Sequence, residues 1–220
     1  MKMLDRFVGK EQECTQELAK DSQSVKTLNL RGDYRLFLGE FRGAITDFER
    51  SIVIQPEDDP GHWRLGIAYY FAGDYEKAAR QFQKYYDVDD RDRETGIWKY
   101  LAQERFDGQT KARAEMLVFD KPDREPFVQL YAMFAGKMTP DEVLADIKKR
   151  GLENNAEAAF FGNFYAGVAE SELGHREKAV KLLRTALEIP EARITGGAAG
   201  YMWQVCRLFW ERLRDDAGRK

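Results

Sequence analysis

Apolar side chains recur at helical spacing along much of the chain. Near the C-terminus Met202, Val205, Cys206, Phe209 and Leu213 fall on one face of a helix, because helical residues three or four positions apart share a face. The same spacing predicts further helices within the segments 1–24, 97–101, 127–137 and 139–151. The pattern of apolar and polar positions therefore predicts an all-α protein.

Two stretches of the chain repeat each other 34 residues apart. The matched residues are Gly32 and Gly66, Phe37 and Phe71, Gly39 and Gly73, Phe41 and Tyr75, Ala44 and Ala78, and Phe48 and Phe82. A third copy keeps the same mutual spacing in Gly167, Gly174 and Ala179. Self-similarity at a fixed period of this length is typical of helical repeat proteins.

The segment between the second and third copies has room for two degenerate units, because Gly66 and Gly167 are 101 residues apart, one short of three periods. Within it, Ala112–Phe119 is predicted as a second helix, and Thr139 with Glu142 predicts a capping box that starts another. The predicted organisation is an N-terminal helical flank 1–24, an array 25–193 with units 25–58, 59–92, 93–126, 127–159 and 160–193, and a capping helix with tail 194–220.

Each repeated residue type has a physical reason, which the first copy illustrates. Gly32 lies within a predicted helix, where glycine costs about 1 kcal/mol relative to alanine, so a partner helix is expected to cross closely there, with Ala44 as the small residue facing it. Gly39 is expected to end the first helix in a left-handed conformation. Phe48 is expected to fill the space between units. The equivalent expectations hold for Gly66, Ala78, Gly73 and Phe82, and for Gly167, Ala179 and Gly174.

These residues resemble the tetratricopeptide repeat (TPR), a 34-residue helix-turn-helix unit. The likeness lies in a glycine, a second glycine seven positions later, an alanine five after that and an aromatic four further on. It implies an α-α superhelix, a TPR-type solenoid of about five helical pairs with a C-terminal capping helix. It also implies a noncatalytic adaptor or scaffold that binds a peptide or partner domain in a concave groove.

Within the TPR proteins, the order of intact and degenerate units resembles the bacterial lipoprotein NlpI family, most closely over Trp98–Leu117 and Phe164–Leu187. That resemblance implies a homodimeric scaffold that recruits a periplasmic protease and peptidoglycan hydrolases. The chain departs from the family at Cys14, which follows Glu11-Gln12-Glu13 and is therefore no lipobox cysteine. As the sequence stands we expect a cytoplasmic protein; removal of an N-terminal signal would instead imply a periplasmic or outer-membrane-associated one.

The TPR resemblance places a partner-binding groove on the first helix of each unit. Carried over position by position, the groove residues are Asn29, Asp33, Phe37, Trp63, Ile67, Tyr70, Phe71, Ile97, Leu101, Arg105 and Phe164. Aromatic residues and arginine are frequent binding anchors, although half or more of these side chains could equally pack between repeats. A clamp for a C-terminal carboxylate is not expected, because Asp33 would repel it.

Composition narrows the classes of partner. The chain has 35 basic and 38 acidic residues, which gives no global electrostatic footprint for nucleic acid. No apolar stretch reaches the roughly 18–20 residues that span a bilayer. Two cysteines, Cys14 and Cys206, are too few for a disulfide framework or a cysteine-based zinc site. We therefore expect a protein or peptide partner, with no nucleic acid, no transmembrane segment, no metal and no cofactor.

Catalytic chemistry finds little support in the sequence. Phosphate loops, nucleophile elbows and His-Glu-x-x-His motifs are absent. His62 could join Asp58 and Asp59 at a metal, but it is more simply a helix-start residue, and His175 is expected to be solvated in a turn. The run Thr195–Gly200 could present backbone amides to an anion, but a plain entry to the last helix is the simpler interpretation. We expect no enzyme.

Overall fold

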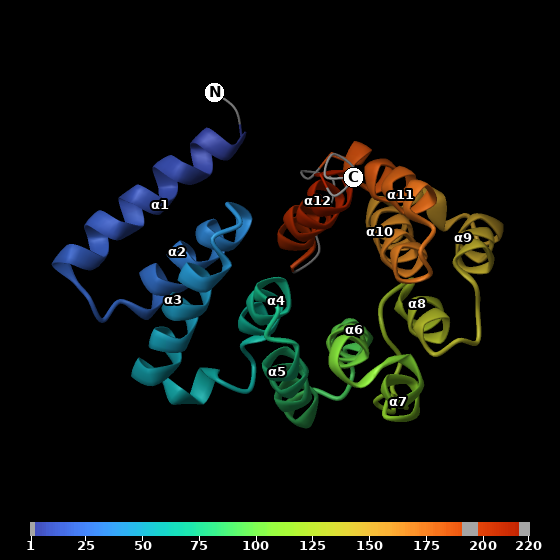
Figure 1. Ribbon diagram of the computed structural model, residues 1–220, viewed down its shortest axis with the longest axis horizontal. Coiled ribbons are helices and arrows are strands. Elements are labelled where there is room, and N and C mark those ends of the chain that lie inside the picture. The colour runs from blue at the N-terminus through green and yellow to red at the C-terminus, as the bar shows by residue number, and fades with distance from the viewer. Residues whose placement is uncertain (1–2, 191–197, 216–220) are drawn as a thin grey trace. The chain divides into compact units, whose positions relative to one another are not determined.

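The computed structural model describes residues 3–190 and 198–215, and every regular element in these ranges is helical. The chain forms two compact units, residues 1–121 and 122–220, which Figure 1 shows in blue to green and in yellow-green to red. The unit boundary lies inside the predicted repeat 93–126. Half of the candidate anion segment, residues 195–197, lies outside the described residues.

The first unit contains seven α-helices and one short 3-10 helix in its described part. They are α1 (Met3–Lys20), α2 (Val25–Phe37), α3 (Phe41–Ile54), η1 (Pro56–Asp58), α4 (Trp63–Ala72), α5 (Tyr75–Val88), α6 (Arg93–Asp107) and α7 (Gln109–Ala114). Each α-helix packs against the next one in sequence (Figure 1). The helix predicted within 1–24 is confirmed as α1, which buries Phe7, Cys14 and Leu18 but leaves Leu4 and Val8 exposed.

The second unit contains five α-helices and one 3-10 helix in its described part. They are α8 (Phe127–Phe134), α9 (Pro140–Lys149), η2 (Leu152–Asn154), α10 (Ala156–Glu172), α11 (Arg176–Glu188) and α12 (Ala199–Asp215). The predicted capping box at the start of α9 is confirmed, with Thr139 and Glu142 bonding each other's backbone N–H groups. Helix α10 pairs with α11, and α11 also packs on α12.

Glycines end the first helix of each intact copy. Gly39, Gly73 and Gly174 have φ values of 81°, 84° and 80°, a region that side chains with a Cβ rarely adopt. Each glycine therefore allows the chain to reverse into the second helix of the hairpin. The expected left-handed turns are confirmed at all three positions.

The glycines within helices lie under the large residue of the facing helix. A Cβ at Gly32 would come within 2.4 Å of the Phe48 ring, and one at Gly66 within 2.7 Å of the Phe82 ring. At Gly167 the residue in contact is Leu183, at 2.9 Å. The predicted close crossing is confirmed, but the partner is the larger residue four positions after the alanine. Phe48 and Phe82 thus fill space inside their own hairpins and also contact the next one, where Phe48 lies 4.9 Å from the His62 ring and Phe82 6.0 Å from the Trp98 ring.

One predicted helix is wrong. The segment Ala112–Phe119 was expected to be helical, but α7 ends at Ala114 and the chain then runs without regular structure to Pro126. Side chains from earlier helices bind the backbone there: Arg93 donates to the carbonyls of Phe119 and Lys121, and Tyr86 donates to that of Val118. These contacts tie the backbone of this segment to α5 and α6.

A buried ion cluster joins the first three helices. Asp47 of α3, 1% exposed, accepts hydrogen bonds from Arg31 and Arg35 of α2. Arg35 also pairs with Glu11 of α1 at 2.9 Å. The cluster satisfies a buried carboxylate and fixes α1 against the first hairpin. Among the described helices, none is long and apolar enough to cross a membrane.

The glycine–aromatic contacts lead to a stability prediction. Gly66→Ala places a methyl group inside the Phe82 ring, so overpacking of about 1–3 kcal/mol should outweigh the gain of about 1 kcal/mol in helix propensity. Gly61→Ala is the matched control, since its nearest neighbour is the Asp58 carbonyl at 3.8 Å. Denaturant unfolding followed by circular dichroism should show a loss for Gly66→Ala alone; equal stability of the two variants would contradict the close crossing.

Candidate functional site

Helices α2 and α4 are the first helices of two neighbouring hairpins, and two polar contacts join them. Asn29 Oδ1 of α2 lies 2.8 Å from His62 Nε2 at the start of α4. One turn further along α2, Asp33 Oδ2 accepts a hydrogen bond of 2.9 Å from Arg64 Nη1. Two of the predicted groove residues, Asn29 and Asp33, therefore bind the adjacent hairpin of their own unit.

His62 caps α4 and is held in one tautomer. Its Nδ1 accepts the backbone N–H of Leu65 at 3.3 Å, so the ring proton lies on Nε2 and is donated to Asn29. A second proton would have to lie on Nδ1, against an N–H donor. Burial, followed by the nearby charge of Arg64, lowers the pKa of His62 to about 4. The imidazole is therefore neutral at pH 7.

Asp33 is a partly satisfied buried carboxylate. Its Oδ2 has the Arg64 contact, whereas Oδ1 is buried without a hydrogen-bond partner in the described part of the chain. Burial raises the pKa of Asp33 to about 6, against the opposing effect of the Arg64 charge. Arg64 lies with its guanidinium 5.9 Å from the Phe48 ring and is about one third exposed.

Most of the predicted groove residues lie in the cores of their units. Each of the following is at most 9% exposed: Phe37, Ile67, Tyr70, Phe71, Ile97, Leu101 and Phe164. Phe37 packs against Phe7 of α1, with ring centroids 5.4 Å apart, and Tyr70 packs edge-on against Trp98 at 5.3 Å. These side chains therefore pack between helices and leave little surface for a partner.

The remaining groove residues are more accessible. Trp63 and Asn29 are half-buried, and Arg105 is exposed with its guanidinium 5.7 Å from the Tyr75 ring. Trp63 begins α4, next to His62, so it lies at the end of α4 that contacts Asn29. In the first unit, the accessible surface near the predicted groove therefore lies on α2 and at the starts of α4 and α5.

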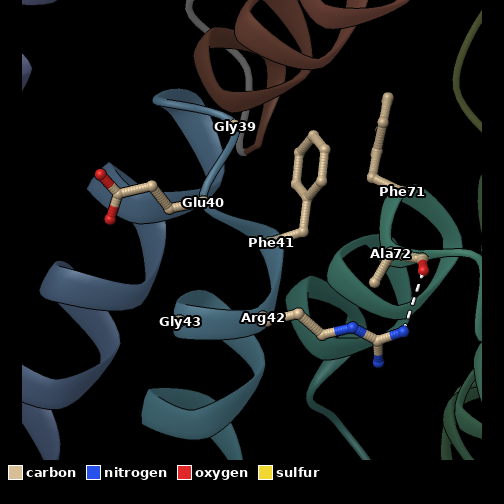
Figure 2. A pocket seen from close by; sticks show the side chains of 7 residues that line it. All are labelled: Gly39, Glu40, Phe41, Arg42, Gly43, Phe71 and Ala72. Carbon is tan, nitrogen blue, oxygen red and sulfur yellow. Dashed lines mark hydrogen bonds between the residues drawn. The ribbon is translucent and has the colours of Figure 1, made fainter.

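A pocket of about 460 Å³ lies between the first two hairpins of this unit. It is lined by Gly39, Glu40, Phe41, Arg42, Gly43, Phe71 and Ala72. Figure 2 shows the Phe41 and Phe71 side chains pointing in the same direction, while Glu40 points away from them. The two rings are stacked with centroids 5.3 Å apart, so they form an apolar wall.

Arg42 closes one side of this pocket through contacts with the second hairpin. Its guanidinium donates to the Ala72 carbonyl at 3.1 Å, the dashed line in Figure 2, and pairs with the Asp74 carboxylate. These contacts fix the separation of the two turns that carry Phe41 and Phe71. The pocket is a shallow hollow that is widely open to solvent, so it can receive a side chain only at the surface.

Phe41 was not among the residues selected from the sequence, whereas Phe71 was. A signal for it existed: Phe41 and Tyr75 are an aromatic pair at the 34-residue period, directly after the turn glycines. The TPR resemblance places the groove on the first helix of each unit, whereas Phe41 and Tyr75 each begin a second helix. Tyr75 packs edge-on against Tyr70 at 5.5 Å and extends the aromatic surface toward Arg105.

The proposed metal partners of His62 are engaged elsewhere. Asp58 accepts from Gln55, and Asp59 pairs with Lys84 at 2.7 Å. Among the described residues, no three His, Cys, Asp or Glu side chains form a group that could hold a metal ion. His175, expected to be solvated, is exposed but also bonds the buried carboxylate of Glu170 at 2.6 Å.

Comparison with protein-family models gives no match for this chain. The TPR and NlpI resemblances therefore stay predictions from the sequence.

The neutral state of His62 leads to a pH prediction. Because its pKa is lower in the folded chain, its contribution to stability is complete above pH 6.5 and is lost as the pH falls toward 4. The natural chain should lose up to about 3 kcal/mol relative to His62→Gln over this interval. The variant should be about 1 kcal/mol less stable at pH 7, where the cap is missing. Urea unfolding at several pH values tests this; a difference independent of pH would contradict it.

Proposed function

We propose that this chain is a noncatalytic protein-interaction module that binds a peptide segment of a partner at the edge of its first two hairpins. The observation that carries the proposal is the pocket between the turns of these hairpins, with Phe41 and Phe71 as its apolar wall. Glycine-ended hairpins at a fixed period place such turns side by side. The partner would enter a preformed surface, which limits the entropy lost on binding.

The aromatic residues near the pocket support a site that takes apolar side chains. Phe41 stacks on Phe71, Phe71 contacts Tyr70 at 5.7 Å, and Tyr70 contacts Tyr75. Phe41 and Tyr75 are half-buried, so this row of rings reaches the surface at two points. Partly exposed aromatic side chains give much contact area for little lost conformational freedom, which makes them frequent anchors at interfaces.

Three perturbed titrating groups of the first unit, Tyr69, Tyr100 and His62, have structural explanations, which agrees with binding rather than catalysis by these groups. Burial and a hydrogen bond to Glu49 raise the pKa of Tyr69, whose hydroxyl joins α4 to α3. Burial, followed by the neighbouring charge of Glu104, raises the pKa of Tyr100 to about 12. His62 is occupied at both ring nitrogens. None of these groups is left as an obvious acid, base or nucleophile.

Selection of peptides from a random library on the immobilised protein tests the proposal. Enriched peptides should carry a large apolar residue, and Phe41→Ala should weaken their binding roughly tenfold or more, because it removes the exposed half of the pocket wall. Val53→Ala is the matched control, since Val53 lies on the same helix and is 78% exposed. Isothermal titration calorimetry gives the dissociation constants. Peptides that bind both variants equally, or no enrichment at all, would refute the site.

Trp63 allows binding and folding to be separated. Trp63 is half-buried at the start of α4, at the opposite end of this helix from Phe71, so Trp63→Ala should weaken binding of a partner segment that continues along α4 from the pocket, while the fold persists. Ala78 is fully buried, so Ala78→Phe should instead unfold the first unit by overpacking. Circular dichroism melts distinguish the two variants. Equal destabilisation would show that Trp63 is a packing residue only.

A further inference from the structure

We propose that Asp33 and Arg64 form a proton-operated latch between α2 and α4. Proton uptake by Asp33 in weakly acidic solution would open this ion pair and leave the Arg64 charge uncompensated on the surface that the first two hairpins share. The proposal concerns the first unit itself and does not depend on the identity, or the existence, of a partner.

The geometry of the pair supports the latch. Asp33 is joined to Arg64 by one hydrogen bond of 2.9 Å, through Oδ2 alone, while Oδ1 is buried and has no partner in the described part of the chain. A carboxylate with one oxygen unsatisfied is poorly compensated for the water it has lost. Protonation removes the charge that burial penalises. The neutral acid would therefore be well tolerated in this position.

Arg64 has little else to hold it once Asp33 is neutral. Its other polar or ring contact in the described part of the chain is the Phe48 ring, 5.9 Å from the guanidinium carbon, and about one third of the side chain is exposed. The guanidinium stays charged at all relevant pH values. Loss of the carboxylate charge therefore changes this surface by one positive charge, where at neutral pH the two groups cancel.

The charged groups on the neighbouring helices do not replace Arg64. From α4, His62 is neutral and donates its Nε2 proton to Asn29. On α2 itself, Tyr34 is the neighbouring titratable group. Glu11 of α1 and Asp47 of α3 are paired with Arg31 and Arg35 in the separate buried cluster, and Glu17 of α1 accepts from Thr27 of α2. Asp33 thus responds chiefly to its own burial and to Arg64, which agrees with the rise of its pKa to about 6.

Protonation of Asp33 should stabilise the folded chain relative to the unfolded chain. Because the folded chain binds the Asp33 proton more tightly than the unfolded chain, this residue adds stability as the pH falls from 7 toward 4. Relative to Asp33→Asn, which carries a neutral side chain at every pH, the folding equilibrium constant of the natural chain should rise about tenfold between pH 7 and pH 5. All other titrating groups are common to both proteins and cancel in this comparison.

Carbon-13 NMR of the full chain tests the latch directly. The Asp33 carboxyl signal should titrate near pH 6, and the Arg64 guanidinium signals should move with the same midpoint. Arg64→Gln should shift the Asp33 midpoint upward, because the charge that opposes protonation is gone. This variant keeps the test valid even if Asp33→Asn fails to fold.

Three results would overturn the proposal. The first is an Asp33 carboxyl that titrates at its ordinary value near 4. The second is an Asp33 midpoint that Arg64→Gln leaves unchanged. The third is a titration near pH 6 in which the Arg64 signals stay constant, which would mean that the pair does not open.

Discussion

The packing of an aromatic ring against a glycine within each hairpin is the constraint on which the first unit depends. Gly32 beneath Phe48 and Gly66 beneath Phe82 bring the two helices of a hairpin closer than any residue with a Cβ allows. The ring then lies fully buried between them, and its apolar area stabilises the hairpin. The close approach offsets the helix propensity that glycine loses. It also sets the positions of the turns, and therefore of Phe41 and Phe71 at the pocket.

Polar contacts, by contrast, differ from one hairpin junction to the next. Between α1, α2 and α3 the cluster around Asp47 is buried and charged. Between α2 and α4 the contacts are a neutral Asn29–His62 hydrogen bond and the Asp33–Arg64 ion pair. Apolar contacts give each junction most of its stability, since net gains from polar pairs are small. The polar pairs instead specify which faces meet, and the proposed Asp33–Arg64 latch would make one junction sensitive to pH.

Local features of the fold could be predicted because they depend on residues close in sequence. The turn at Gly39 needs a residue free of a Cβ, and the start of α9 needs Thr139 and Glu142 three positions apart. The end of α7 could not be predicted in this way. The segment after it is tied to Arg93, which reaches the carbonyl of Phe119 from 26 residues earlier. A contact between residues so far apart in sequence leaves no mark on the local apolar pattern.

The candidate site was predicted less well than the fold, for a related reason. Periodicity assigns Ile67 and Tyr70 to one face of α4, but it does not say whether the next helices cover that face; α5 and α6 do so through Tyr75 and Trp98. The pocket instead lies beside the hairpin turns, where the neighbouring helices no longer cover the side chains and Phe41 is half-buried. In the first unit the neighbouring helices cover this face of α4, whereas Phe41 and Tyr75, each two positions after a turn glycine, stay half-buried.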